Sequence, residues 1–499
     1  MLTIRKEHKR NQYEMMITID DLVPEDHLVR KIDKVIDFSF IYDLVIDKYS
    51  LITGRPSIDP VVLIKIVLIQ YLFGIRSMRQ TIKEIETNVA YRWFLGYGLR
   101  EKIPHFSTFS KNYERRFRGT DLFEKIFKRI LEEAIKNKLI DADEIFIDST
   151  HVKASANKKK YEKEIIELEV KSYKEKLEKE INEDRKNNGK KELRSKTSEK
   201  ETKEIKVSTT DPDSGMLNKQ GKEKMFAYSY HTSCDRNGFV LGVKVTGANK
   251  HDSEIFEEVL EETIKNTNKK PRGVAIDAGY KKMFILKSLF EKEILPVVPY
   301  TRPMGKKEIM RKKEFKYEKE KNVYICPMGE ELKYVTTNRS GYREYKSNPI
   351  ICEMCPLLNK CTQSKDKTKR IFRHIWEDSL EKADKIRLSE YGKKIYSLRK
   401  QTIERVFADL KEKHAMRWTT LRGHERVTNE AYMVYTAMNI KKMAMWLWKK
   451  VKRKGKSSIF SPILHYFMKK FIKILKNFQY FSKKYPILGY TGMGFVYNL

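Results

Sequence analysis

The spacing of apolar residues changes several times along the chain, and each change predicts a different kind of structure. Over residues 20–118 apolar residues recur every three or four positions, which is typical of short amphipathic helices. One helix is predicted to begin at Pro60 and to end before Gly74, and Ser77 is the expected N-cap of the next. Short helices joined by tight turns fit either a helix-turn-helix-like DNA-binding module or a plain helical bundle.

Strand patterns dominate from residue 224. The stretch KMFAYSYHTSCD alternates in polarity, RNGF supplies a hairpin turn, and VLGVKVTG returns as a second strand. Helix and strand patterns then alternate as far as ILPVVPY, residues 294–300. A hairpin followed by alternating helices and strands predicts a mixed α/β sheet with crossover helices.

Residues 157–206 have a different character, because they are nearly all charged and carry apolar residues at helical spacing. We expect a protruding helix or short coiled coil, followed by a linker. Such an arm could contact DNA or a second copy of the chain, but charge runs are more often solvated faces.

These patterns predict six parts. They are a helical N-terminal DNA-binding domain (1–120), the first part of an α/β core (121–156 and 207–300), the charged helical arm (157–206), a less regular, Cys-rich and basic insertion (301–377), a helical C-terminal part of the core (378–448) and a basic aromatic tail without an assigned role (449–499).

Two apolar strand patterns end on a carboxylate. In EIFIDSTHVKAS the run from Ile145 to Ile147 stops at Asp148, and in GVAIDAGYKK a similar run stops at Asp277. Burying an unpaired carboxylate costs several kcal/mol, so each acid is either a solvated strand end or the partner of a cation. On neighbouring strands the two charges would repel each other unless a divalent cation such as Mg²⁺ lay between them.

A third candidate carboxylate lies on a helix predicted within residues 396–423. Its apolar face would consist of Ile403, Phe407 and Leu410. Glu404 and Lys411 are seven residues apart and would share a stripe beside that face. If the helix docks on the sheet, it could direct Glu404 towards the aspartates and Lys411 towards a phosphate. The alternative is an ordinary amphipathic helix with charged flanks.

The charge of the chain indicates a polyanionic partner. The 499 residues include 103 Lys and Arg against 68 Asp and Glu, a formal net charge of +35. This excess favours nucleic acid over a membrane surface, although a codon bias towards Lys would explain part of it. The first residues lack the apolar core of a signal peptide, Lys65 interrupts the most apolar stretch, and cysteines are few. We therefore expect a cytoplasmic, nucleoid-associated protein without a membrane partner.

Four of the five cysteines lie in the insertion with the spacing C-x25-C-x2-C-x5-C, at Cys326, Cys352, Cys355 and Cys361. A C-x2-C pair with two further thiols suits a structural Zn²⁺ site, and reduced thiols without a metal are the alternative.

As a set, Asp148, Asp277 and Glu404 resemble the acids of the DDE transposases of bacterial insertion sequences, in particular the group with a YREK signature. The stretches STTDPDSG, KVTGANKHDS and CEMCPLLNKC also resemble that group. The resemblance implies a ribonuclease H-like core that cleaves and transfers DNA strands at the inverted-repeat ends of an insertion sequence. It further implies two Mg²⁺ or Mn²⁺ ions per active site, double-stranded transposon-end and target DNA as partners, and a homodimer on DNA.

The resemblance also assigns roles to residues. Asp148 would bridge both metal ions, and Asp277 and Glu404 would each help to hold one. The signature Arg would be Arg399 by its distance from Tyr396, or Lys400 by its distance from Glu404. The candidate DNA contacts are Tyr396, Arg399, Lys400, Lys411, Arg417, Arg422 and Trp418. The ring of Trp418 would stack on an unpaired base or pack within the protein.

Two other functions are compatible with these residues. A ribonuclease H-like nuclease of the resolvase kind would share the acidic strand ends, but it would not need the helical N-terminal domain or the long insertion. A catalytically inactive DNA-binding derivative would keep the fold, although all three acids are intact in this chain.

Overall fold

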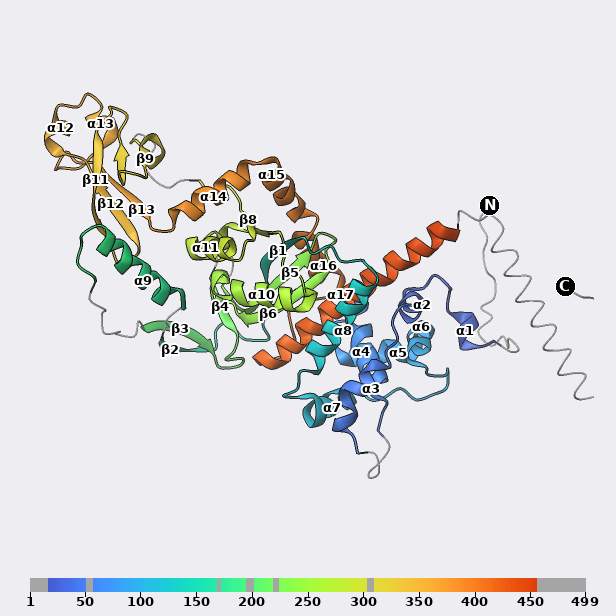
Figure 1. Ribbon diagram of the computed structural model, residues 1–499. Coiled ribbons are helices and arrows are strands. Elements are labelled where there is room, and N and C mark those ends of the chain that lie inside the picture. The colour runs from blue at the N-terminus through green and yellow to red at the C-terminus, as the bar shows by residue number, and fades with distance from the viewer. Residues whose placement is uncertain are drawn as a thin grey trace, which may run out of the picture. The chain divides into compact units, whose positions relative to one another are not determined.

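The computed structural model describes residues 17–50, 57–167, 172–193, 202–218, 224–302 and 309–455 (Figure 1). Contacts divide the chain into a compact unit, Met1–Lys442, and a remainder, Met443–Leu499. The description below concerns the first unit. Most of the predicted basic aromatic tail lies outside the described residues.

The N-terminal region is helical, as predicted. Its elements are α1 (Ile19–Leu22), α2 (Leu28–Asp33), α3 (Phe40–Val45), η1 (Ile46–Lys48), α4 (Pro60–Leu72), α5 (Met78–Thr87), α6 (Val89–Leu95), α7 (Ser107–Asn112), η2 (Tyr113–Phe117) and α8 (Leu122–Lys136). The expected helix start at Pro60 is confirmed, with Asp59 as the N-cap, and Ser77 caps α5 through the Gln80 N–H. No described helix is both long and apolar enough to cross a membrane.

A mixed central sheet follows. Its strands are β1 (Glu144–Lys153), β2 (Tyr161–Glu167), β3 (Thr202–Ser208), β4 (Gly215–Leu217), β5 (Met225–Asp235), β6 (Val240–Gly247), β7 (Gly273–Ile276) and β8 (Leu295–Val297). The order is β2-β3-β4-β5-β1-β7-β8, with β6 also on β5. β7 and β8 run parallel to β1, whereas β5 is antiparallel to it. Helices α10 (Asp252–Thr267) and α11 (Met283–Glu291) are the crossovers, so the predicted mixed α/β class is confirmed.

Two of the quoted motifs hold the sheet to the C-terminal helix. Gly215 of STTDPDSG lies so close to the next motif that a Cβ there would be 2.3 Å from the Asn249 amide nitrogen. Asp211 accepts a hydrogen bond from the Gly423 N–H at 3.0 Å, and Asp213 accepts one from the His424 N–H at 2.8 Å. These bonds satisfy the free amides at the start of α17 (His424–Gly455).

The prediction of a charged helical arm is partly wrong. Its first residues form β2, which pairs with β3 along its whole length and extends the central sheet. One pair of opposite charges links the strands diagonally, with Lys163 2.9 Å from Glu204, whereas the residue directly opposite Lys163 is Lys206. Backbone pairing with β3 thus makes this charge-rich stretch a strand rather than a helix.

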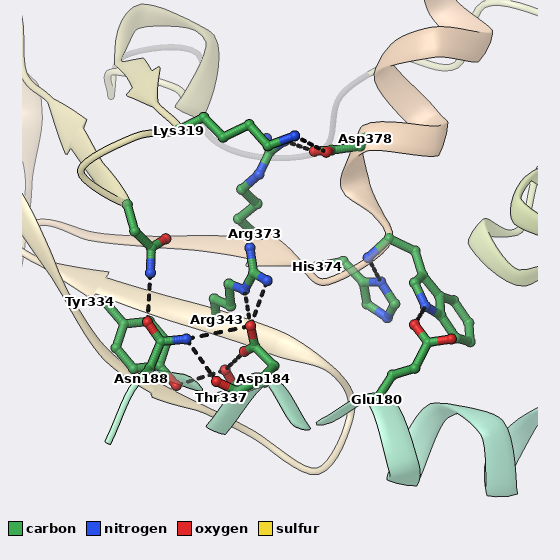
Figure 2. A network of polar contacts seen from close by, with 12 residues as sticks. Glu180, Asp184, Asn188, Lys319, Tyr334, Thr337, Arg343, Arg373, His374 and Asp378 are labelled. Atoms are coloured by element: carbon green, nitrogen blue, oxygen red, sulfur yellow. Dashed lines mark hydrogen bonds and ion pairs between the residues drawn. The ribbon is translucent and has the colours of Figure 1, made fainter. Parts of the chain in front are cut away.

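The remainder of the arm, α9 (Ser172–Asn187), is a helix, but it does not protrude into solvent. The buried Asp184 carboxylate accepts hydrogen bonds from Arg343 at 2.9 Å and from the Thr337 hydroxyl at 2.6 Å (Figure 2). The Glu180 carboxylate binds the Trp376 indole and the Lys287 amine. Through these charges α9 joins the insertion to α11.

The insertion is more regular than predicted. It forms an antiparallel sheet in the order β13-β12-β11-β10-β9, with strands β9 (Lys316–Glu318), β10 (Val323–Ile325), β11 (Glu331–Thr337), β12 (Tyr342–Lys346) and β13 (Arg370–His374). Two short helices, α12 (Pro349–Glu353) and α13 (Leu358–Cys361), lie between β12 and β13. Strands of three to seven residues gave too little alternation to be recognised.

The region after the insertion is helical, as predicted. It contains α14 (Glu377–Leu388), α15 (Glu390–Ser397), η5 (Leu398–Lys400), α16 (Ile403–Lys413) and α17. The end of α16 meets the end of α4, because the His414 ring nitrogen lies 2.7 Å from the Tyr71 carbonyl oxygen. Gly74 has a φ of +66°, and a Cβ there would lie 2.7 Å from the Lys413 carbonyl oxygen. The helical N-terminal region therefore packs directly on α16.

Replacing Gly74 by Ala should destabilise this junction. Gly119→Ala is the matched control, because Gly119 has a similar φ of +70° but no atom within 4 Å of a new Cβ. Both variants lose about 1–2 kcal/mol to backbone strain, and only Gly74→Ala adds a clash with backbone. We expect a clearly larger fall in melting temperature for Gly74→Ala. Equal melting temperatures would show that the junction is not tightly packed.

Candidate active site

Asp148 and Asp277 lie side by side on neighbouring strands. β1 and β7 pair in parallel up to Ile147 opposite Ile276, so the next residue of each strand is an aspartate. The expectation that β1 ends at Asp148 is wrong, since β1 continues to Lys153. The reason is that β5 pairs with β1 along its full length, whereas β7 ends at Ile276. Asp148 thus lies in β1 just beyond the point at which the neighbouring strand β7 ends.

A guanidinium joins these two acids. Arg399 Nη2 lies 2.5 Å from Asp148 Oδ2, and Arg399 Nη1 lies 3.7 Å from Asp277 Oδ1. The Arg399 side chain is only 5 % exposed, and its Nε and Nη1 atoms have no hydrogen-bond partner. Of the two candidates for the signature Arg, Arg399 therefore faces the acids, whereas the side chain of Lys400 is exposed.

The surroundings of Asp148 oppose its ionisation. Burial raises the pKa of Asp148 to about 6, and the charges of Asp277 and Asp252 push it in the same direction. The Arg399 guanidinium and a hydrogen bond from the Ser149 N–H act in the opposite direction. Without a further cation, the ionised form of Asp148 is poorly stabilised.

Glu404 comes to the same region through a broken helix. The prediction of one continuous helix from Tyr396 is wrong, because α15, η5 and α16 are separate and Thr402 has a non-helical ψ of −97°. Glu404 is exposed in the first turn of α16. Burial raises the pKa of Tyr396, and the charges of Asp277, Glu404 and Asp148 add to the shift. Tyr396 thus lies within electrostatic reach of all three acids.

The face of α16 that packs on β1 differs slightly from the predicted one. Its buried residues are Ile403, Val406 and Leu410, and Phe407 is half-buried. Lys411 lies about two helical turns beyond Glu404 on the same helix and is half-buried. The prediction that this helix docks on the sheet is confirmed, because α16 contacts β1.

The remaining candidate DNA contacts follow α16. Arg417 pairs with Glu412, and both side chains are exposed. Arg422 donates to the Ser155 carbonyl oxygen at 3.0 Å. Trp418 forms a β-bridge with Lys153 at the end of β1 and is 44 % exposed. Its exposed ring leaves base stacking open as a role.

A fourth carboxylate, that of Asp252, lies near these acids, because its charge acts on the pKa of Asp148. The Asp252 carboxylate lies 3.6 Å from the buried His231 ring, whose other nitrogen is 2.9 Å from the Thr246 hydroxyl. Burial lowers the pKa of His231 to about 4, so this ring is neutral at neutral pH. Asp252 is the first residue of α10, and the preceding His251 caps the helix by accepting from the Ser253 N–H.

The donor set suits a hard divalent cation. Carboxylate oxygens are the ligands that Mg²⁺ prefers, and Asp148 and Asp277 already share one cationic partner. Within the described ranges no three His, Cys, Asp or Glu side chains are yet grouped closely enough to hold an ion.

Comparison with known families gives two matches. Residues 17–115 match the family described as "Transposase domain (DUF772)", and residues 325–444 match the family described as "Transposase DDE domain". Both matching families are transposase families, and the second is a DDE domain. No curated protein matches the chain. The second match covers Glu404 and the four clustered cysteines, whereas Asp148 and Asp277 lie before it. The helical N-terminal region corresponds to the first match.

The raised pKa of Asp148 predicts a pH-dependent metal affinity. Below about pH 6 the carboxyl group is protonated and cannot serve as an anionic ligand. Mn²⁺ binding to the DNA-free protein, followed by electron paramagnetic resonance, should weaken by roughly tenfold for each pH unit below that value. Arg399→Leu removes a charge that lowers this pKa, so the loss should begin at higher pH. Arg399→Lys should resemble the native protein, and an unchanged pH profile in Arg399→Leu would contradict the assignment.

Proposed function

We propose that this protein is a transposase that cuts DNA at the inverted-repeat ends of its own element and joins the released ends to target DNA. Asp148, Asp277 and Glu404 are the proposed metal-holding carboxylates. The observation that carries the proposal is the adjacency of Asp148 and Asp277 in parallel strands, with one buried cation between them. The mixed sheet with its crossover helices agrees with a ribonuclease H-like core.

The acids have distinct positions in this proposal. Asp148 is central because it is buried and interacts with the charges of both Asp277 and Asp252. Glu404 is exposed on a separate element, so it closes the site from the side that DNA approaches. Two bound Mg²⁺ ions would supply charge neutralisation at the attacking and leaving oxygens of an in-line displacement. No side chain is required as a nucleophile.

Arg399 is a positioning residue in this proposal. Its guanidinium neutralises Asp148 and Asp277 before the site is loaded and keeps the two carboxylates from repelling each other. The ring of Tyr396, whose centroid lies 5.6 Å from the guanidinium carbon, covers one side of it. Lys400, Lys411, Arg417, Arg422 and Trp418 are the proposed DNA contacts around these acids.

Neutral replacements of the three acids test the catalytic assignment. Asp148→Asn, Asp277→Asn and Glu404→Gln should each lower Mg²⁺-dependent cleavage of inverted-repeat DNA by about 100-fold or more, because each removes a charged ligand. DNA binding should persist, since the change removes negative charge. Glu412→Gln is the matched control, as Glu412 is an exposed acid of the same helix that pairs with Arg417. Normal cleavage by Glu404→Gln would refute the triad.

Replacing Lys400 tests the proposed DNA contact next to Arg399. Lys400→Ala removes an exposed positive charge next to Arg399 and should weaken binding to all DNA sequences alike. The slope of log affinity against log salt should become less steep by about one, the value for a single lost phosphate contact. Lys136→Ala in α8, where the amine pairs with Glu133 at 3.1 Å, serves as the control and should leave the slope unchanged. Identical slopes in both variants would exclude a phosphate contact at Lys400.

A further inference from the structure

The insertion sheet rests on a small core. The buried cluster contains Phe315, Tyr324, Leu332, Tyr345 and Ile371. Neither α12 nor α13 contributes a buried residue to it, although the half-buried Cys361 of α13 packs against it. On α12 Ile350 is 75 % exposed, and Met354 just beyond it is 86 % exposed. Apolar burial therefore does not explain why the segment from Pro349 to Cys361 stays against the sheet.

All four cysteines of the insertion line one small cavity of about 40 Å³ between this segment and the sheet. None of them forms a disulfide, and all four are half-buried. Cys326, just after β10, and Cys361, at the end of α13, both pack at the edge of the buried cluster. The fifth cysteine, Cys234, is buried in β5 and has no place at this cavity.

The backbone holds these thiols in turns. The Gly329 N–H donates to the Cys326 carbonyl oxygen at 2.9 Å, and Gly329 has a φ of +88°, which a side chain would disfavour. In the second turn the Cys355 N–H donates to the Cys352 carbonyl oxygen at 3.1 Å. Each turn presents a cysteine at the start of a tight bend, so the sulfur atoms come from two separate, rigid loops.

We propose that Cys326, Cys352, Cys355 and Cys361 bind one structural Zn²⁺ ion that fastens the Pro349–Cys361 segment to the turn after β10. Four thiolates form a closed tetrahedral site, and each thiol releases its proton to solvent on binding. The sulfur atoms line the cavity without yet meeting at one point, so the side chains must turn inward to reach Zn–S distances of about 2.3 Å. This inference is independent of the proposed cleavage chemistry.

Metal analysis of the full-length protein tests the site. Protein purified under reducing conditions without chelator should contain about one zinc ion per chain by elemental mass spectrometry. Cys326→Ser and Cys352→Ser should lose it, whereas Cys234→Ala, at the cysteine outside the cavity, should retain it. Asp148→Asn should also retain it, which separates this site from the catalytic acids. Zinc contents that are equal in all variants, or near zero in the native chain, would overturn the proposal.

A second measurement covers variants that fail to fold. The native protein is stripped of metal with a chelator and loaded with Co²⁺, which should give the intense absorption of tetrahedral cobalt and the charge-transfer bands of bound thiolates. Limited proteolysis should cut within residues 349–361 only in the stripped protein, and added Zn²⁺ should restore protection. Octahedral cobalt spectra, disulfides in the purified protein, or cleavage that is independent of Zn²⁺ would each refute the site.

Discussion

The repulsion between two neighbouring carboxylates is the constraint on which the rest of the candidate site depends. Parallel pairing of β1 with β7 places Asp148, whose side chain is 18 % exposed, beside Asp277, whose side chain is 54 % exposed. The buried guanidinium of Arg399, in η5 after α15, contacts both acids and offsets this repulsion. The chain breaks at Thr402 before α16 packs its apolar face on β1. Glu404, in the first turn of α16, stays exposed.

The sequence predicted the features that depend on local pattern. Short apolar runs, the Asn-Gly hairpin and the Ser77 cap all appear where expected, because strand alternation and capping are properties of neighbouring residues. The partner of Asp148 could not be predicted in this way. Arg399 is 251 residues away, and its burial in an ion pair depends on how α15 meets the sheet. The contact of Asp252, in α10, with His231, in β5, could not be predicted for the same reason.

The error in the arm has a physical origin. Charged residues were interpreted as solvated, but β2 pairs its backbone with β3, and α9 buries Asp184 against Arg343 and Thr337. A charge that has a fixed partner of opposite sign is structural and does not attract DNA. Net charge therefore overstates the DNA-facing surface, and only unpaired basic residues such as Lys400 should be counted towards it.

The contacts of α9 also explain how the insertion is oriented. A sheet of short strands with a small core has little rigidity of its own. α9 contributes one set of ion pairs to this sheet, through Asp184, and another to α11, through Lys176 and Glu180. α11 begins six residues after Asp277, so α9 links the insertion to the helix that follows this acid. The linking side chains of α9 lie more than 90 residues before Asp277 in the sequence.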